Sequence, residues 1–492
     1  MNQKHIEQIL KIGVQLSAER DLNRLLEQLL TCVMELSHCD AGTLYLLDGD
    51  VLRFKIMRNH TMGVYSGGDG KEPDMAPVPL KRENMCAMAL LERRTISIAN
   101  VKESQEYDFS GPIRYDAVTG YHTQSMLAVP MCNREGEKLG VLQLINAMDD
   151  AGNIRPFPDE MTLVLESVAS QAAITIQNVR YIQAIKELFY SFVRVMSSAV
   201  DERSPYNGNH TRHMAAYGDR FLDYLNQKAA DAGKKPPFPS AEREELLMSV
   251  WLHDIGKLVI PLEIMDKPAR LLPDQHTAFL HRMEILRLQS EIDRLSGRLT
   301  DSGQEALIQK TQEAEALVEE VNITGFLSDE KLEALARLAA LTYTDRDNQT
   351  KPWLTPEEYA MLSIRKGTLS EEERSIMESH VSVTEKLLSQ IQLSHDFSHV
   401  KEWASGHHEL LNGSGYPRHL AGREIPTEVR IITILDIFDA LTADDRPYKP
   451  GMPVERALSI LKTMAEKEGK LDPELVRLFT ESRCWEYRQT AI

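Results

Sequence analysis

This sequence has few cysteines, no long apolar run and no excess of positive charge. Its five cysteines form no CxxC pair and no zinc-finger spacing, which excludes a zinc finger and indicates reduced thiols. No run of about 18 apolar residues occurs, so no transmembrane helix is expected. The N-terminal segment mixes charge into its apolar positions and lacks a signal-peptide core, so we expect a cytoplasmic protein. The net charge of −18 argues against a nucleic-acid polymer as a partner.

The N-terminal third has the pattern of an α+β domain. Apolar residues at helical spacing predict helices over 4–17 and 22–34. Strand patterns then predict five strands, at 42–47, 51–56, 95–98, 125–131 and 140–145. A long helix follows, so we expect an antiparallel sheet packed between helices.

One strand pair of this region resembles a known sensor family. The segment SMLAVPMCNREGEKLGVLQLIN, residues 125–146, resembles a GAF domain, and the resemblance covers about residues 15–178. It implies a GAF sensor domain over residues 1–178, an α+β sandwich that binds a small ligand of unknown identity.

Part of a cyclic-nucleotide signature is present in the same region. Some GAF domains that bind cyclic nucleotides carry an Asn-Lys…Phe…Asp-Glu pattern. The corresponding residues here include an alanine in place of the lysine: Asn146, Ala147, Phe157, Asp159 and Glu160. The alternative is a polar turn before an acidic helix start, where carboxylates interact favourably with the helix dipole.

An unbroken helix is predicted over residues 159–199. Its apolar residues alternate spacings of four and three, as in Val168, Ala172, Thr175, Val179 and Ile182. That spacing is typical of a coiled coil, so we expect a connecting helix that pairs with a second subunit in a homodimer. Packing of the stripe on both domains of one chain is the alternative.

The segment WLHDIGKLVIP, residues 251–261, places polar groups at the end of an apolar helix. Burial of His253 and Asp254 is costly unless something satisfies them, and imidazole and carboxylate ligands suit a transition metal. If the helix continues through Gly256, Lys257 shares their face, where an ammonium suits a phosphate substrate. A buried His–Asp hydrogen bond without metal is the alternative.

Several further blocks accompany this segment. One block, NGNHTRH, precedes it in the chain. The others follow it in the order IMESHVSV, HHE, NGSGYP, ILDIFDALT and RPYK. Together they resemble the HD-GYP family of bacterial cyclic-dinucleotide phosphodiesterases. The resemblance covers about residues 199–271 and 369–465 and implies an all-α HD-type domain over 199–492.

The resemblance implies a site for two metal ions. Its seven ligands would be His210, His253, Asp254, His380, His407, His408 and Asp436. One ion would be held by His210, His253, Asp254 and Asp436, and the second by Asp254, His380, His407 and His408. This nitrogen and oxygen set suits divalent iron foremost, or manganese, nickel or zinc. Two such ions can activate water as a nucleophile.

Other residues would act on the substrate. The resemblance implies catalytic roles for Asp254, Lys257 and Asp439, the last by holding a ligand histidine or Lys257 or by protonating the leaving oxygen. Substrate contacts would come from Lys257, Tyr416, Arg446 and Lys449. Satisfied structural carboxylates and solvated charges are the alternatives for Asp439, Arg446 and Lys449. Tyr206 stands where some relatives carry a carboxylate for a third ion, so we expect two ions.

The second domain is interrupted by an insertion at about residues 272–368. The residues Ile285, Leu288, Ile292, Leu295 and Leu299 form one apolar stripe, and Leu307, Ala314, Leu317 and Val321 form another. Because the turn TDSG separates the stripes, they predict an antiparallel helical hairpin. Further helices are predicted near 328–341 and 356–365. The arm could be a lid, a dimer contact or a partner site.

The sequence thus predicts a multidomain protein, an α+β GAF sandwich followed by an all-α HD-type domain with an inserted hairpin. The resemblance implies a metal-dependent phosphodiesterase, regulated by the GAF domain, that hydrolyses cyclic di-GMP to pGpG and onward to GMP. The alternatives are 3′,3′-cyclic GMP-AMP or another phosphoester as substrate. A catalytically weak module that binds cyclic dinucleotides or partner proteins is the alternative from another class.

Overall fold

The computed structural model describes residues 19, 21–68, 70–133, 135–203, 208–345, 347–393, 397–443 and 451–486. The helix predicted over 4–17 lies outside them. The chain separates into two units, Met1–Phe189 and Tyr190–Ile492. No helix in the described ranges combines the length and hydropathy of a membrane span.

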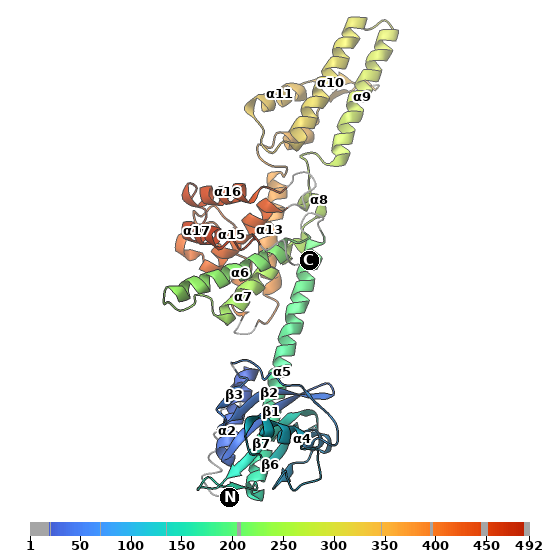
Figure 1. Ribbon diagram of the computed structural model, residues 1–492. Helices are drawn as coiled ribbons and strands as arrows, with labels where there is room; N and C mark the ends of the chain where they lie inside the picture. The colour runs from blue at the N-terminus through green and yellow to red at the C-terminus, as the bar shows by residue number, and fades with distance from the viewer. Residues whose placement is uncertain are drawn as a thin grey trace. The chain divides into compact units, whose positions relative to one another are not determined.

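The first unit is built on one antiparallel sheet (Figure 1). Its strand order is β3-β2-β1-β7-β6-β5, with β4 paired to β2 and β8 paired to β7. The strands are β1 (Cys39–Asp48), β2 (Val51–Asn59), β3 (Val64–Ser66), β4 (Val78–Pro79), β5 (Ile96–Ile98), β6 (Met126–Cys132), β7 (Lys138–Met148) and β8 (Ile154–Arg155). The helices are α2 (Leu22–Ser37), α3 (Met85–Glu92), α4 (Ser110–Thr119) and α5 (Asp159–Asp201). The predicted α+β sandwich is confirmed.

Each face of the sheet carries its own apolar core. Successive side chains of a strand point to opposite faces, so Leu44 and Leu46 face one core while Tyr45 faces the other. The first core is completed by α2 and the start of α5, and the second by α3. The second face also carries a cavity.

Two residues of the partial cyclic-nucleotide signature, Asn146 and Phe157, stabilise the fold. Asn146 is buried with φ 57°, and its side chain accepts a hydrogen bond from Gln124 N (2.8 Å) and donates one to His122 O (2.8 Å). Phe157 is buried in the core that contains α2. Neither lines the cavity. This geometry favours the polar turn over a nucleotide-binding signature.

The helix α5 has two different environments. Its first part is buried against the sheet, where Val168 and Ala172 are fully covered. Further along, Ile182, Ile185, Leu188 and other large apolar side chains up to Val195 are 53–71% exposed. This second stripe is therefore an exposed apolar surface.

The second unit is almost entirely helical, as predicted. Its main helices are α6 (His210–Asp231), α7 (Ser240–Leu252), α8 (Leu262–Met265), α13 (Glu371–Leu388), α14 (Val400–Ala404), α15 (Thr427–Thr442), α16 (Val454–Glu466) and α17 (Pro473–Ser482), with 3-10 turns η1 (Ile255–Val259) and η3 (Gly422–Glu424). An aromatic cluster of Phe221, Phe438, Phe479 and Trp485 holds α6, α15 and α17 together. This core fixes α15 beside α6, and both carry candidate site residues.

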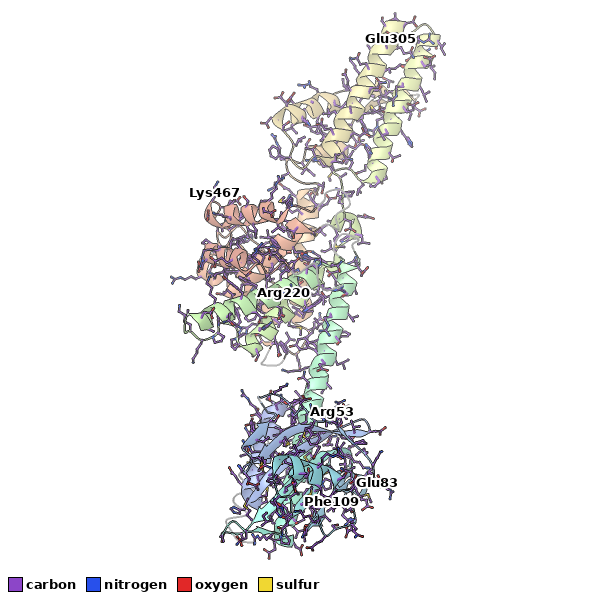
Figure 2. The ribbon with its side chains drawn as sticks, viewed as in Figure 1. Arg53, Glu83, Phe109, Arg220, Glu305 and Lys467 are labelled. Carbon is purple, nitrogen blue, oxygen red and sulfur yellow. The ribbon has the colours of Figure 1, made fainter. Side chains whose placement is uncertain are left out.

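The insertion forms its own small core. It contains α9 (Pro273–Leu295), α10 (Asp301–Ile323), α11 (Asp329–Ala339), a hairpin of β9 (Thr342–Thr344) and β10 (Thr350–Pro352) that the sequence did not predict, and α12 (Pro356–Leu362). The helices α9 and α10 form the predicted hairpin, with the exposed Glu305 near its turn (Figure 2). Thr355 and Glu358 form the capping box of α12.

The stripe that predicted the hairpin was assigned to the wrong face of α9. Ile285, Leu288, Ile292 and Leu295 are 51–70% exposed. The buried contact is made instead by Phe279, Met283, Leu286 and Ser290. Both sets repeat at helical spacing, so periodicity alone could not decide which face meets α10.

Candidate metal centre

The structure brings all seven predicted metal ligands together in the second unit. They are His210 at the start of α6, His253 and Asp254 at the end of α7, His380 on α13, His407 and His408 after α14, and Asp436 on α15. Six of them form two groups, His210 with His253 and Asp254, and His380 with His407 and His408. The seventh, Asp436, lies 3.3 Å from His210 Nε2 and 3.8 Å from His408 Nδ1. Within each group the ligand atoms lie within 4.8 Å of one another.

Three of the histidines are oriented in the same way. The Nδ1 atoms of His253, His380 and His407 donate to the backbone carbonyl three residues earlier, at 2.7, 2.6 and 2.7 Å. A carbonyl oxygen can only accept, so Nδ1 carries the hydrogen and Nε2 keeps its lone pair. The local helical turn therefore fixes the tautomer that a metal ligand requires.

The freed nitrogens converge on Asp254. Its Oδ1 lies 3.4 Å from His380 Nε2 and 3.8 Å from His407 Nε2, and its Oδ2 lies 3.2 Å from His253 Nε2. The three Nε2 atoms and Asp254 Oδ1 are buried and have no hydrogen-bond partner among the residues that the structure describes. Leaving four such atoms unsatisfied is costly, and metal ions held by the two groups would satisfy them. The donor set thus fits metal ions.

The fourth histidine is held by carboxylates on α15. His210 Nδ1 donates to Asp439 Oδ2 at 2.8 Å, and its Nε2 lies 3.3 Å from Asp436 Oδ1. Asp439 is fully buried and also lies 3.5 Å from His213 Nδ1. Of the roles expected for Asp439, this position favours holding the ligand histidine. His213, which was not among the predicted site residues, belongs to this network.

Burial and neighbouring charges set the protonation of the site. Burial lowers the pKa of His408 to about 4 and the pKa of His407 well below its usual value. Burial opposes ionisation of Asp254, but His253 and Lys257 hold its pKa well below normal. Neutral imidazoles and an ionised carboxylate are the forms that bind metal.

His210 differs from the other histidines in its charge. Burial disfavours its charged form, yet Asp436 and Asp439 raise its pKa to about 10. The carboxylates therefore favour a positive charge at this point. A metal ion beside Nε2 can supply that charge in place of the proton.

The turn after Asp254 is tighter than predicted. The helix α7 ends at Leu252, and the chain continues as the 3-10 turn η1 rather than as an α-helix through Gly256. Lys257 still reaches Asp254, with Nζ 2.5 Å from Oδ2. A Cβ on Gly256 would lie 1.9 Å from His380 O, so only glycine allows η1 to pack this closely on α13.

The loop after His408 brings an aromatic ring to the site. Tyr416 lies over His408, with ring centroids 4.7 Å apart and planes inclined by 32°. A Cβ on Gly415 would lie 2.4 Å from His408 O, which keeps this loop close to the ligand. Buried Glu409 anchors it by accepting hydrogen bonds from Arg418 N (2.7 Å) and Leu420 N (2.9 Å).

The end of α5 contacts the site directly. Asp201 Oδ1 accepts a hydrogen bond from Thr211 Oγ1 at 3.0 Å, next to His210. Arg203 donates to the carbonyl oxygens of Lys257 (2.6 Å) and Ile260 (3.1 Å). Sequence reasoning missed these contacts because no motif marks them; their position just before the first histidine block was the available signal.

Three predicted positions cannot be placed. Arg446 and Lys449, expected to contact substrate, and Tyr206, expected to mark the absence of a third ion, lie outside the described residues. Their roles stay predictions.

Comparison with known families finds one match in each of the two units. The model of the GAF domain matches residues 21–176, and that of the HD domain matches residues 298–475. The HD match includes His380, His407, His408 and Asp436. His210, His253 and Asp254 precede it, and the fold brings them to the same place.

Curated relatives match parts of the chain. A 3′3′-cGAMP-specific phosphodiesterase of Vibrio cholerae is 41% identical over 108 residues, 22% of each chain. The cyclic di-GMP phosphodiesterase response regulator RpfG of Xanthomonas campestris is 37% identical over 25% of this chain and 31% of its own. A cyclic di-GMP phosphodiesterase of Thermotoga maritima is 38% identical over 24% of this chain and 30% of its own. The chain thus spans under a third of the length of these relatives.

Proposed function

We propose that this chain, in which a GAF domain is joined to an HD domain of the HD-GYP type, is a metal-dependent phosphodiesterase of cyclic dinucleotides. Cyclic di-GMP is the first candidate, because relatives in Xanthomonas and Thermotoga are named for it. The Vibrio relative is named for 3′3′-cGAMP, which makes that dinucleotide the second candidate. Since both kinds of relative match at 37–41% identity, the two substrates belong in the same experiment.

One observation carries this proposal. Four buried ligand atoms, three imidazole nitrogens and one carboxylate oxygen, converge without a hydrogen-bond partner in the described part of the chain. Imidazole and carboxylate together suit iron, manganese, nickel or zinc, and iron is the first candidate. When bound, such ions polarise a phosphodiester and lower the pKa of water.

The side chains around the ions have separate roles. Asp254 lies between the two ligand groups and would serve both ions. Lys257 places an ammonium beside Asp254, where it can orient a phosphate oxygen. Asp439 holds His210 in position, and Tyr416 offers a ring face to a base beside His408. Arg446 and Lys449 would bind the substrate's phosphates or guanine.

The test is hydrolysis by the full chain, purified without oxygen and loaded with Fe(II) or Mn(II). Both cyclic dinucleotides are supplied, and metal content is measured on the same sample. We expect turnover with about two metals per chain. Asp254→Ala should abolish turnover and remove most of the metal, while Asp274→Ala, on exposed α9, serves as the control. Metal-free protein under every loading would contradict the proposal.

A binding module without turnover is the alternative function. It would retain two metals and bind a cyclic dinucleotide without hydrolysing it. Equilibrium binding measured beside turnover on the same metal-loaded sample separates the two.

We also propose that the chain is a homodimer joined through the exposed stripe of α5. Phe192 and Leu188 lie on that stripe and expose 61% and 71% of their surfaces. Isolated exposed apolar residues are ordinary, but a stripe at coiled-coil spacing indicates a partner helix. Phe192→Glu should produce monomers in analytical ultracentrifugation. Arg194→Glu, which adds a similar charge outside the stripe, should not.

A further inference from the structure

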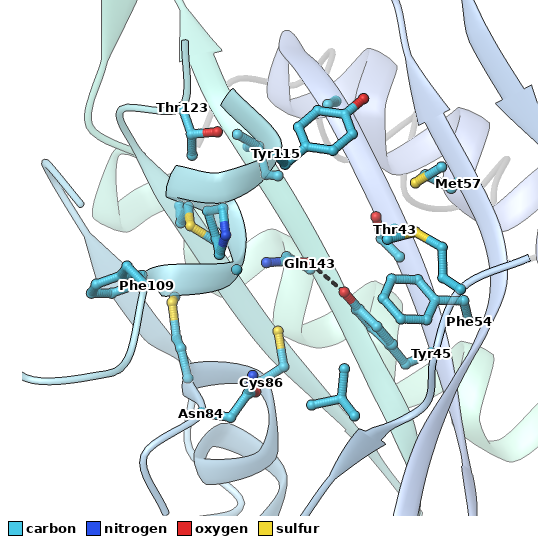
Figure 3. A pocket seen from close by; sticks show the side chains of 18 of the residues that line it. Thr43, Tyr45, Phe54, Met57, Asn84, Cys86, Phe109, Tyr115, Thr123 and Gln143 are labelled. Atoms are coloured by element: carbon cyan, nitrogen blue, oxygen red, sulfur yellow. Dashed lines mark hydrogen bonds between the residues drawn. The ribbon is translucent and has the colours of Figure 1, made fainter. Parts of the chain in front are cut away.

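The first unit holds a cavity whose ligand the proposed catalytic function does not specify. The cavity has a volume of about 240 Å³ and lies on the face of the sheet that carries α3 and α4 (Figure 3). A cavity of about 150 Å³ is enough for benzene, and pockets for drug-sized molecules begin at about 300 Å³. This volume therefore suits a molecule of one or two fused rings.

The walls of the cavity favour an aromatic molecule. Five sulfur-bearing side chains line it, namely Met57, Met75, Met85, Cys86 and Met126. Thioethers make favourable contacts with aromatic rings and adapt to ring shape. Rings from β1, β2 and α4 add to the lining; Tyr45 and Phe54, with centroids 4.6 Å apart, form one side.

Gln143 brings a buried amide to the lining of this cavity. Gln143, at the centre of β7, is 8% exposed, and its Oε1 accepts a hydrogen bond from Tyr45 Oη at 2.8 Å (Figure 3). Because the oxygen of the Gln143 amide faces Tyr45, its nitrogen points away from Tyr45. No described residue forms a hydrogen bond with this nitrogen. A ligand acceptor would satisfy its hydrogens.

The charged groups of the lining are already engaged. Arg58 donates to Thr31 Oγ1 at 2.8 Å and lies over the ring of Tyr65. Asp108 accepts a hydrogen bond from Ser110 N at 2.9 Å. No lysine occurs among the described lining residues. For a phosphate or carboxylate, the described lining offers one cation, Arg58, whose guanidinium is already held by Thr31 and Tyr65, and it adds the like charge of Asp108. A neutral ligand avoids the cost of burying a charge here.

From these features we infer that the cavity binds a neutral aromatic molecule of one or two rings that presents a ring nitrogen or carbonyl to the Gln143 amide. This inference deepens the proposal of a regulated phosphodiesterase by naming the class of its sensor ligand. The ligand enters beside α4, which lines the cavity with Tyr115 and buries none of its own residues. An element with so few buried contacts opens at low cost.

The test is calorimetric titration of the full chain with a matched pair of probes. Quinoline and naphthalene have the same shape, but only quinoline carries an acceptor. We expect quinoline to bind about tenfold more tightly, the value of one net hydrogen bond. Gln143→Leu should remove this preference and leave naphthalene binding unchanged. The control Gln177→Leu lies outside the cavity and should leave both affinities unchanged.

A second variant tests whether the probes bind in this cavity, and a third probe, cyclic GMP, tests whether the ligand is a neutral aromatic molecule. Ala41→Phe fills the cavity and should abolish binding of both neutral probes. Equal binding of the matched pair to the wild type would overturn the role of Gln143. Absence of binding by either probe, or tighter binding of cyclic GMP that Ala41→Phe removes, would overturn the inference. Because none of these titrations requires turnover, their outcome is independent of the phosphodiesterase proposal.

Discussion

Asp439 should control the affinity of one metal ion and not the other. It holds His210 from behind by a charge-assisted hydrogen bond of 2.8 Å inside a fully buried site. Such a bond contributes about 1.5–3 kcal/mol. Loss of a carboxylate behind a ligand histidine typically weakens metal binding about 10–100-fold, which corresponds to about 1.4–2.7 kcal/mol. The two estimates agree.

Two substitutions separate charge from hydrogen bonding at this position. Asp439→Asn keeps an acceptor for His210 Nδ1 but loses the charge, so we expect about a tenfold weaker first ion. Asp439→Ala loses both and leaves Nδ1 unpaired, so we expect about a hundredfold weakening. The ion at His380, His407 and His408 should be retained, because none of these contacts Asp439 in the structure.

The assay is metal titration at controlled free Mn(II), with the two dissociation constants fitted separately. Glu428→Gln, near the other end of α15, is the matched control because it changes the same charge. Equal loss of both ions from Asp439→Asn, or unchanged affinity in Asp439→Ala, would refute this reasoning. Unfolding curves measured beside the titration identify any general loss of the fold.

Three further predictions follow from single contacts. Gly256→Ala should lower the unfolding free energy, measured in urea, by about 3 kcal/mol, because the added Cβ would lie 1.9 Å from a carbonyl oxygen of α13. The control Gly325→Ala adds a Cβ in open space and should be nearly neutral. Arg203→Ala should reduce kcat about tenfold at unchanged metal content, because it removes the donor that holds the Lys257 carbonyl. A loss of metal that parallels the loss of kcat would contradict this role of Arg203. Burial raises the pKa of Cys86 to about 12, so roughly 10⁻⁴ of it is thiolate at pH 8, and mass spectrometry should show alkylation only after unfolding.

The sequence by itself determined the fold class and the candidate ligand set. The segment 125–146 was predicted as a strand pair, and it appears as β6 paired with β7. Helix caps such as Thr355 with Glu358 also formed as predicted, since a cap depends only on residues within one turn. The histidine and aspartate blocks could be assigned because, taken together and in their order, they resemble the motifs of the HD-GYP family.

Only the tertiary structure decided which faces and side chains meet. The exposed stripe with Ile285 and the buried set with Phe279 share one period, and packing selected between them. Asp439 had several possible partners until α15 came to lie beside α6. The roles of Asp201 and Arg203, and the direction of Gln143, depend in the same way on residues distant in sequence. Local propensity acts within a few residues, whereas these contacts depend on how separate elements pack against each other.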